Sequence, residues 1–168
     1  MPKTMSPKKS PRSTELTHVD ERGRVRMVDV GGKSESAREA VAEGEVLMSA
    51  EARAAIRARR VRKGDPLQTA RVAGVMAAKQ TSSIIPLCHP LPLTHIDVEL
   101  TPTDRGYRIT SRVGTIARTG VEMEALVAVS AAALTLYDML KAVDRGMTIT
   151  AIKLLEKRGG ASGEYRRR

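Results

Sequence analysis

The hydrophobic and polar positions of this chain follow two different periods, and each period predicts one kind of element. Residues 37–48 alternate weakly, with small apolar side chains on one side, which predicts a strand. Residues 96–101 and 107–113 alternate more clearly, and the turn sequence at 103–106 joins them into a predicted β-hairpin. Residues 148–156 form the last predicted strand.

Three segments are predicted to be helices. Ser49 is a suitable N-cap for a short helix that runs to Arg60. The segment from Asp65 to Lys79 starts with an aspartate N-cap, a proline at the first helical position and a glutamine where a capping box needs Glu or Gln. Apolar residues at helical spacing predict the longest helix over residues 121–143.

The resulting order, β-α-β-β-α-β, predicts an α+β fold of the ferredoxin-like type, with an antiparallel sheet and helices on one face. The other face of the sheet then needs cover, and we expect a second copy of the chain to supply it, so that the protein is oligomeric. The length predicts one domain over residues 15–168, preceded by a basic tail over residues 1–14.

The composition of the chain limits which class of protein it can be. The chain has 168 residues, 41% of them hydrophobic, and it contains no Phe and no Trp, so the core is expected to consist of small aliphatic side chains. No apolar run approaches the roughly 18 residues that span a membrane. The single cysteine, Cys88, cannot form an internal disulfide, and a cytoplasmic location is expected.

The formal net charge of +10 is concentrated at the two ends of the chain, and the body is only mildly basic. This charge leaves open an alternative function, a nucleic-acid-binding module of ferredoxin-like fold. Such modules stack bases on aromatic side chains of the sheet, and the predicted hairpin offers only Tyr107. No specific nucleic acid is therefore expected as a partner.

The proline-interrupted segment 84–93 excludes regular structure and carries Cys88 and His89. A braced loop of this kind is a common place for binding residues, and His89 could contact phosphate or transfer a proton near neutral pH. The prolines could equally do no more than end a helix and begin a strand. One Cys and three His do not give the ligand set of a structural zinc site, so no metal is predicted.

Two further groups of charged residues are candidates for chemistry. Glu122 and Glu124 lie in the first turn of the longest helix, where they suit the helix dipole without any further role. Asp138 and Lys141 are three residues apart, hence neighbours on one helix face. They could form a surface ion pair, or a partly buried pair that transfers protons.

Three segments could bind anions. Lys63 stands just before a predicted helix N-terminus. Residues 31–34 (Gly-Gly-Lys-Ser) look like the end of a phosphate loop, but Met27 occupies the position of the required first glycine, which excludes a Walker site. The basic, glycine-rich residues 157–163 could form a phosphate-binding nest or a flexible exit to the C-terminus.

Taken in order, several segments closely resemble the cyclic pyranopterin monophosphate synthase family of molybdenum cofactor biosynthesis. Together they extend over most of the chain, so the resemblance is much more specific than any one segment. The segments are LTH at 16–18, RMVDV at 26–30, GDPL and ARVAGVMAAK within 64–79, IIPLCHPLPL at 84–93, ARTGVEMEAL at 117–126 and LYDMLKAVDRGM at 136–147.

The resemblance implies a lyase that converts 3′,8-cyclo-7,8-dihydroguanosine 5′-triphosphate to cyclic pyranopterin monophosphate and releases pyrophosphate. It implies a ferredoxin-like fold and a homohexamer, a trimer of dimers, with active sites at a subunit interface. Because no redox step occurs, no cofactor is expected to be obligatory. Mg²⁺ is expected only as a companion of the triphosphate or the pyrophosphate.

The resemblance also implies roles for particular residues. Asp138 and Lys141 correspond to the main acid–base pair, and Lys63 to a second proton donor or base. One departure is Ala161, which stands where the family usually has a basic residue, and it places one phosphate contact in doubt. The implied substrate-binding residues are Leu87, Cys88, His89, Glu122, Met123, Glu124 and Lys157.

Overall fold

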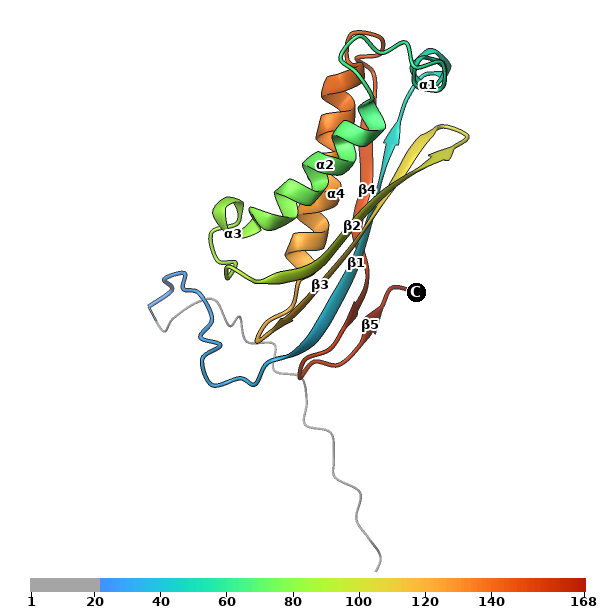
Figure 1. The fold of residues 1–168 in the computed structure, drawn as a ribbon. Coiled ribbons are helices and arrows are strands. Elements are labelled where there is room, and N and C mark those ends of the chain that lie inside the picture. Colours follow the sequence, from blue (N-terminus) through green and yellow to red (C-terminus); the bar gives the residue numbers. More distant parts are fainter. Residues whose placement is uncertain (1–21) are drawn as a thin grey trace, which may run out of the picture.

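The computed structural model of the protein describes residues 22–168 (Figure 1). The predicted tail at 1–14 and the motif at 16–18 lie outside the described residues. The elements in chain order are β1 (Ser36–Leu47), α1 (Ala50–Arg57), α2 (Pro66–Lys79), α3 (Thr81–Ile84), β2 (Leu93–Thr103), β3 (Gly106–Ala117), α4 (Glu122–Leu140), β4 (Thr148–Arg158) and β5 (Tyr165–Arg166).

The strands form one five-stranded sheet in the order β2-β3-β1-β4-β5, and every neighbouring pair is antiparallel. Helix α4 packs against β1, β3 and β4, and α2 packs against α4 and β2. Figure 1 shows α2 and α4 together on one face of the sheet. The predicted α+β class, the antiparallel sheet and the placement of the helices are confirmed.

Several element boundaries differ from the prediction. Helix α1 ends at Arg57 instead of Arg60, because Arg59 adopts a left-handed backbone with φ of 53° and the Arg60 amide closes back onto the carbonyl of Ala55. The longest helix ends at Leu140, before the predicted end at residue 143. The single turn α3 and the two-residue strand β5 were not predicted, since neither is long enough to show a period.

The start of α2 follows the sequence signal in part. The Asp65 carboxylate accepts hydrogen bonds from the Leu67 and Gln68 amides at 2.9 and 3.1 Å, and Pro66 occupies the first helical position. The Gln68 side chain accepts from Arg71 instead of reaching back to the cap, so the capping box is not formed. Asp65 alone therefore satisfies the first free amides of the helix.

Small side chains allow the helices to approach the sheet and each other closely, as the lack of large aromatic residues suggests. A Cβ atom at Gly44 in β1 would lie 2.8 Å from Cγ1 of Val129 in α4. A Cβ atom at Gly74 in α2 would lie 2.9 Å from the carbonyl oxygen of Ala128 in α4. The core between these elements consists mainly of Ala, Val, Leu, Ile and Met side chains.

Among the described residues, α4 is long and apolar enough to cross a membrane by length and composition. The prediction that no apolar stretch approaches that length was therefore wrong. The stretch was missed because the acidic residues of the first turn and Asp138 interrupt its apolar residues in the sequence. Half of the 18-residue apolar stretch within α4 is buried inside the domain. The packing of α4 against three strands and α2 accounts for its apolar surface.

The sheet face opposite the helices carries ion pairs. On β1, alternate residues point toward and away from α4, and Glu39 and Glu43 point away, since the ideal Cβ of Gly44 meets α4. Glu39 contacts Arg112 at 2.6 Å, and Glu43 contacts Lys153 at 3.2 Å and Arg108 at 3.5 Å. This face is largely charged, so it does not by itself require an apolar cover, contrary to the sequence-based reasoning.

Candidate functional site

Three predicted catalytic side chains meet at one end of the molecule. The ammonium group of Lys63 lies 2.7 Å from Oδ2 of Asp138 and also donates to the Asp138 carbonyl oxygen at 2.9 Å. The ammonium group of Lys141 lies 2.8 Å from Oδ1 of the same carboxylate. The loop before α2 and the last turn of α4 thus place one carboxylate between two cations.

These contacts decide the charge state of the cluster. Hydrogen bonds from Lys141 and then from Lys63 lower the pKa of Asp138 to about 2, and the same bond to Asp138 raises the pKa of Lys141. The cluster therefore holds a weakly basic carboxylate, and Lys141 keeps its proton more firmly than a free lysine does. The side chains of Asp138 and Lys141 are about half exposed, so the partly buried pair that was considered from the sequence is not present in the single chain.

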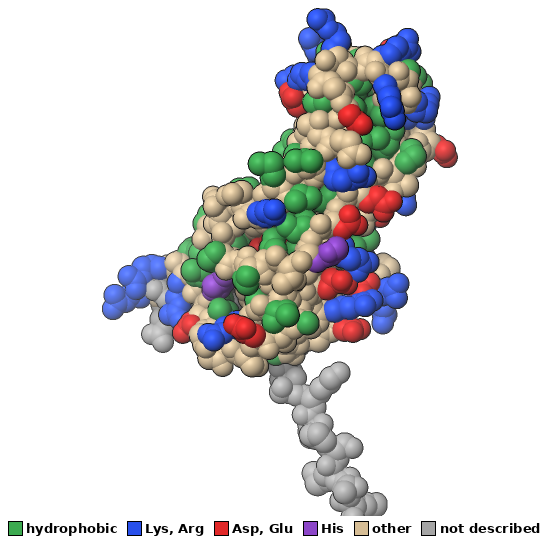
Figure 2. Space-filling view, viewed as in Figure 1, with side chains coloured by type: hydrophobic (Ala, Val, Ile, Leu, Met, Phe, Trp, Pro, Cys, Tyr) green, Lys and Arg blue, Asp and Glu red, His purple; other side chains and the backbone are tan. Residues whose placement is uncertain are grey.

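Lys63 does not extend the N-terminus of α2 into an anion site. The first amides of that helix are already hydrogen-bonded to Asp65, and the Lys63 side chain is directed to Asp138. Figure 2 shows that basic side chains gather at the end of the molecule that carries α1. The cluster of Lys63, Asp138 and Lys141 therefore lies in a cationic environment.

The predicted substrate-binding residues gather at the opposite end of α4. A pocket of about 670 Å³, called here the apolar pocket, lies between the loop after α3, the first turn of α4 and the segment before β1. That segment contributes Val28, Val30 and Lys33. The predicted residues that line the pocket are Leu87, Cys88, His89, Glu122, Met123 and Glu124.

Burial controls the ionisation of two of these groups. Glu124 is only 4% exposed, and this burial raises the pKa of its carboxyl. Burial, and then the charge of Glu124, raises the pKa of the Cys88 thiol. Cys88 is therefore held as a neutral thiol, which is a weak nucleophile, and Glu124 can hold a proton more readily than an exposed carboxyl group.

A second pocket, of about 780 Å³ and called here the cationic pocket, adjoins the apolar pocket. Lys157, the seventh predicted substrate residue, lines it and lies 3.5 Å from Glu122. Gly159 and Gly160, both with positive φ, form a turn at its wall, and Ala161 follows them. The basic residues that line the pocket are Lys33, Arg38, Arg118, Lys157 and Arg158.

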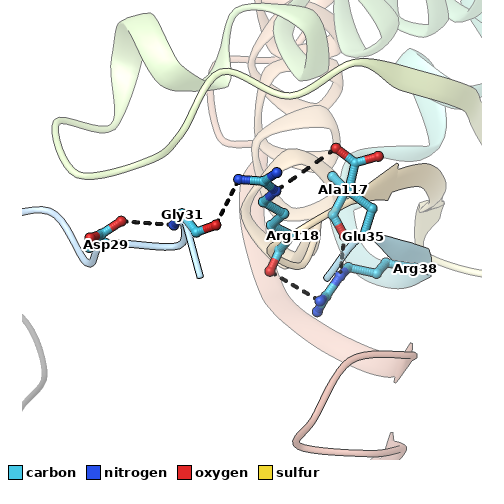
Figure 3. Close-up of polar contacts among 6 residues, drawn as sticks. All are labelled: Asp29, Gly31, Glu35, Arg38, Ala117 and Arg118. Carbon is cyan, nitrogen blue, oxygen red and sulfur yellow. Dashed lines mark hydrogen bonds and ion pairs between the residues drawn. The ribbon is translucent and has the colours of Figure 1, made fainter. Parts of the chain in front are cut away.

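Sequence reasoning did not single out Arg38 and Arg118, and it set Lys33 aside with the rejected phosphate loop. Figure 3 shows how the two arginines join distant segments. Arg38 donates to the carbonyl oxygens of Ala117 and Arg118 at 2.9 and 3.0 Å, and Arg118 donates to the Gly31 carbonyl oxygen at 2.9 Å. The motif ARTGVEMEAL contains Arg118, but the hydrophobic periodicity of the sequence gives no sign that Arg118 contacts Gly31.

One chain does not bring the two groups of predicted residues together. Glu122 and Asp138 lie in the first and last turns of α4, and at 1.5 Å per residue they are about 24 Å apart along the helix axis. A substrate of nucleotide size in the pockets therefore does not reach the cluster of Lys63, Asp138 and Lys141 in the same chain.

Two other predictions concern metal and nucleic acid. Within residues 22–168, no group of three or more His, Cys, Asp or Glu side chains is arranged to hold a metal ion. Tyr107, the aromatic residue on the hairpin, is only 5% exposed. It therefore offers no platform on which a base could stack.

Comparisons with known proteins identify the family of the chain. The model of the MoaC family matches residues 27–160. A protein of Thermomicrobium roseum named cyclic pyranopterin monophosphate synthase is 60% identical over 155 residues, which cover 91% of this chain and 93% of the relative. A protein with the same name from a Roseiflexus species is 55% identical, over 90% of this chain and 98% of the relative. Another from a Nostoc species is also 55% identical, over 91% of this chain and 92% of the relative. The chain belongs to the MoaC family.

Proposed function

We propose that this protein converts 3′,8-cyclo-7,8-dihydroguanosine 5′-triphosphate to cyclic pyranopterin monophosphate, with release of pyrophosphate, in molybdenum cofactor biosynthesis. The observation that carries the proposal is a pair of adjoining pockets of different chemistry. The cationic pocket suits a triphosphate, and the apolar pocket suits a fused ring system whose polar edge faces His89 and Glu124.

The chemistry requires proton transfers at separate atoms, because one ring opens and another closes. When the cyclic phosphate forms, a substrate hydroxyl group gives its proton to the solvent and its oxygen bonds to the α-phosphorus, while the bond from that phosphorus to the pyrophosphate oxygen breaks and pyrophosphate leaves with the electron pair. Lys63 and Lys141 supply the two cationic side chains of the cluster, and each can donate a proton to a substrate atom once its ion pair with Asp138 is broken during the reaction. Asp138, whose pKa is about 2, holds both lysines in place and accepts a proton only while a lysine is deprotonated.

The active site is proposed to be shared between two copies of the chain. The cluster of Lys63, Asp138 and Lys141 from one copy would close the pockets of another, because the two groups of residues are far apart within a single chain. Exposed apolar residues on the helix layer, including Val72 and Met76 of α2 and Leu134 of α4, offer surface for such contacts. The resemblance suggests a homohexamer, a trimer of dimers, as the assembly.

The proposal also covers the fold, the cofactors, the cellular location and the partners of the protein. The strand order β2-β3-β1-β4, with α2 and α4 on one face, supports the ferredoxin-like arrangement for the main part of the fold. No cofactor is proposed to be obligatory, and Mg²⁺ would arrive with the triphosphate or the pyrophosphate. The protein is proposed to act in the cytoplasm, on a small molecule, without a specific nucleic acid or a membrane as partner.

The proposed function is tested by a pyrophosphate-release assay with the purified cyclic nucleotide, run with and without Mg²⁺. Wild-type protein is expected to release one pyrophosphate for each cyclic phosphate formed, as measured by phosphorus NMR. Asp138→Asn is expected to lose about 10²–10⁴-fold in rate, the usual cost of removing a positioned acid–base group. Absence of pyrophosphate release by the wild-type protein under both conditions would refute the proposed function.

A further inference from the structure

We propose that Lys33 binds the α-phosphate, the one that the product retains, and that Arg118 is a positioning residue that holds Lys33 in place. This inference rests on the proposed function, since it assigns parts of the same substrate to the two pockets. It uses a segment, Gly31 to Ser34, that the sequence excludes as a Walker site but that the structure places beside both pockets.

The first observation behind the proposal is the location of Lys33 between the two pockets. Four residues line both the apolar and the cationic pocket, and Lys33 is the one cation among them; the others are Thr119, Gly120 and Glu122. With the fused rings in the apolar pocket and the two leaving phosphates in the cationic pocket, the α-phosphate lies at their junction. A cation at that junction can neutralise the charge on the phosphorus centre where the bond to pyrophosphate breaks.

The second observation is that the Lys33 side chain is exposed and unpaired within residues 22–168. Lys33 is exposed, and its ammonium group makes no hydrogen bond or ion pair with any residue of the part of the chain from 22 to 168. The other candidate lysines are already paired, Lys157 with Glu122 and Lys63 with Asp138. Lys33 can therefore bind a phosphate without first breaking an ion pair.

The backbone around Lys33 is held by specific contacts. The Lys33 amide donates to the carbonyl oxygen of Val30 at 3.1 Å, and the Gly31 amide donates to the Asp29 carboxylate at 2.8 Å, which together form a tight turn. Arg118 donates to the Gly31 carbonyl oxygen at 2.9 Å and so joins this turn to the end of β3 (Figure 3).

Arg118 is itself held in position. Its own carbonyl oxygen accepts a hydrogen bond from Arg38, and its Nε lies 3.9 Å from the Glu35 carboxylate. Because its guanidinium group is engaged with Gly31 and Glu35, we assign to it an indirect effect on the substrate. Removal of Arg118 would free the turn, and Lys33 would lose its defined place at the junction.

Lys33→Gln tests the phosphate contact, because it keeps a polar side chain only one bond shorter and removes its charge. A lost charge-assisted contact is expected to raise KM for the cyclic nucleotide about tenfold or more. Inhibition by inorganic pyrophosphate should stay within about twofold of wild type, since Lys33 is assigned to the phosphate that does not leave. Lys153→Gln, which removes a lysine paired with Glu43 on the opposite face of the sheet, is the matched control and should change neither constant.

Arg118→Gln tests the positioning role through a double-variant cycle. Alone it should raise KM to a similar degree, and combined with Lys33→Gln it should add little, because residues that act as one unit are not additive. Multiplicative effects on KM would show that Arg118 contacts the substrate itself and would overturn the positioning role.

Three results separate this inference from the proposed function. An unchanged KM in Lys33→Gln, with an active wild-type enzyme, refutes the inference and leaves the function intact. A Lys33→Gln variant that weakens pyrophosphate inhibition as much as substrate binding assigns Lys33 to the leaving phosphates, which also overturns it. An inactive wild-type enzyme would reject the function first, before either constant is compared.

Discussion

The proposed shared active site predicts that two inactive variants can restore activity to each other. Asp138→Asn damages the cluster at the end of α4, and His89→Gln damages the apolar pocket at its start. Each variant alone is expected to lose about 10²–10⁴-fold in rate. If a site takes its cluster from one copy and its pocket from another, a mixed oligomer contains some sites in which both halves are intact.

The size of the recovery follows from random assembly. Half of the copies carry an intact cluster and half carry an intact pocket, so about a quarter of the sites in an equal mixture are fully intact. Activity should therefore rise from about 1% or less for either variant to about 25% of wild type, a change well outside the error of a pyrophosphate-release assay. The physical basis is the separation of about 24 Å along α4, which prevents the two groups from meeting within one chain.

The assay needs proof of mixing and one matched control. Co-expression of two differently tagged copies, followed by purification through both tags, selects mixed oligomers. A mixture of Asp138→Asn with Lys141→Ala should gain nothing, because both changes damage the same half of the site. If the mixed oligomer of Asp138→Asn and His89→Gln shows only the mean activity of its parents, each chain holds a complete site and the reasoning from α4 fails.

Three other changes have defined outcomes. Burial raises the pKa of Glu124, so this group favours folding most at acid pH and loses that contribution as the pH rises through its folded-state pKa. Glu124→Gln should therefore raise Tm at neutral pH and raise it less near about pH 4, as measured by calorimetry. Gly44→Ala should lower the free energy of unfolding by about 1–3 kcal/mol in urea, because its Cβ would lie 2.8 Å from Val129, whereas Gly32→Ala, with open space around it, should change it little. Ala161→Lys should lower KM about tenfold in low salt if this position in the cationic pocket has lost a phosphate contact, and an unchanged KM would mean that other cations have replaced it.

Local signals accounted for much of the fold. The hairpin of β2 and β3 was predictable because alternation reports directly which residues face the core. The N-cap at Asp65 and the proximity of Asp138 to Lys141 were predictable because each depends on residues within one turn of helix. The resemblance then indicated which loops to consider, and six of its seven substrate-binding residues line the apolar pocket.

Contacts between residues far apart in the chain were beyond any local signal. Lys63 reaches Asp138 across 75 positions, and Arg118 holds Gly31 across 87. The ion pairs on the outer face of the sheet depend on the register of β1 against β3 and β4, which alternation alone does not set. These contacts decide that Asp138 is a weak base, that Lys33 lies between two pockets, and that the outer face is charged.

The sequence by itself determined the elements, the small-residue core and the identity of most candidate groups, because these depend on residue type and short-range spacing. Only the tertiary structure decided how the groups are distributed. The predicted helix over residues 121–143 already separates Glu122 from Asp138, but the sequence did not show that Lys63 joins one end of it and that the two pockets form at the other. The separation of the complete cluster from the pockets is a property of the folded chain, since the packing of α2 and the turn at Gly31 bring Lys63 to one end and Lys33 to the other.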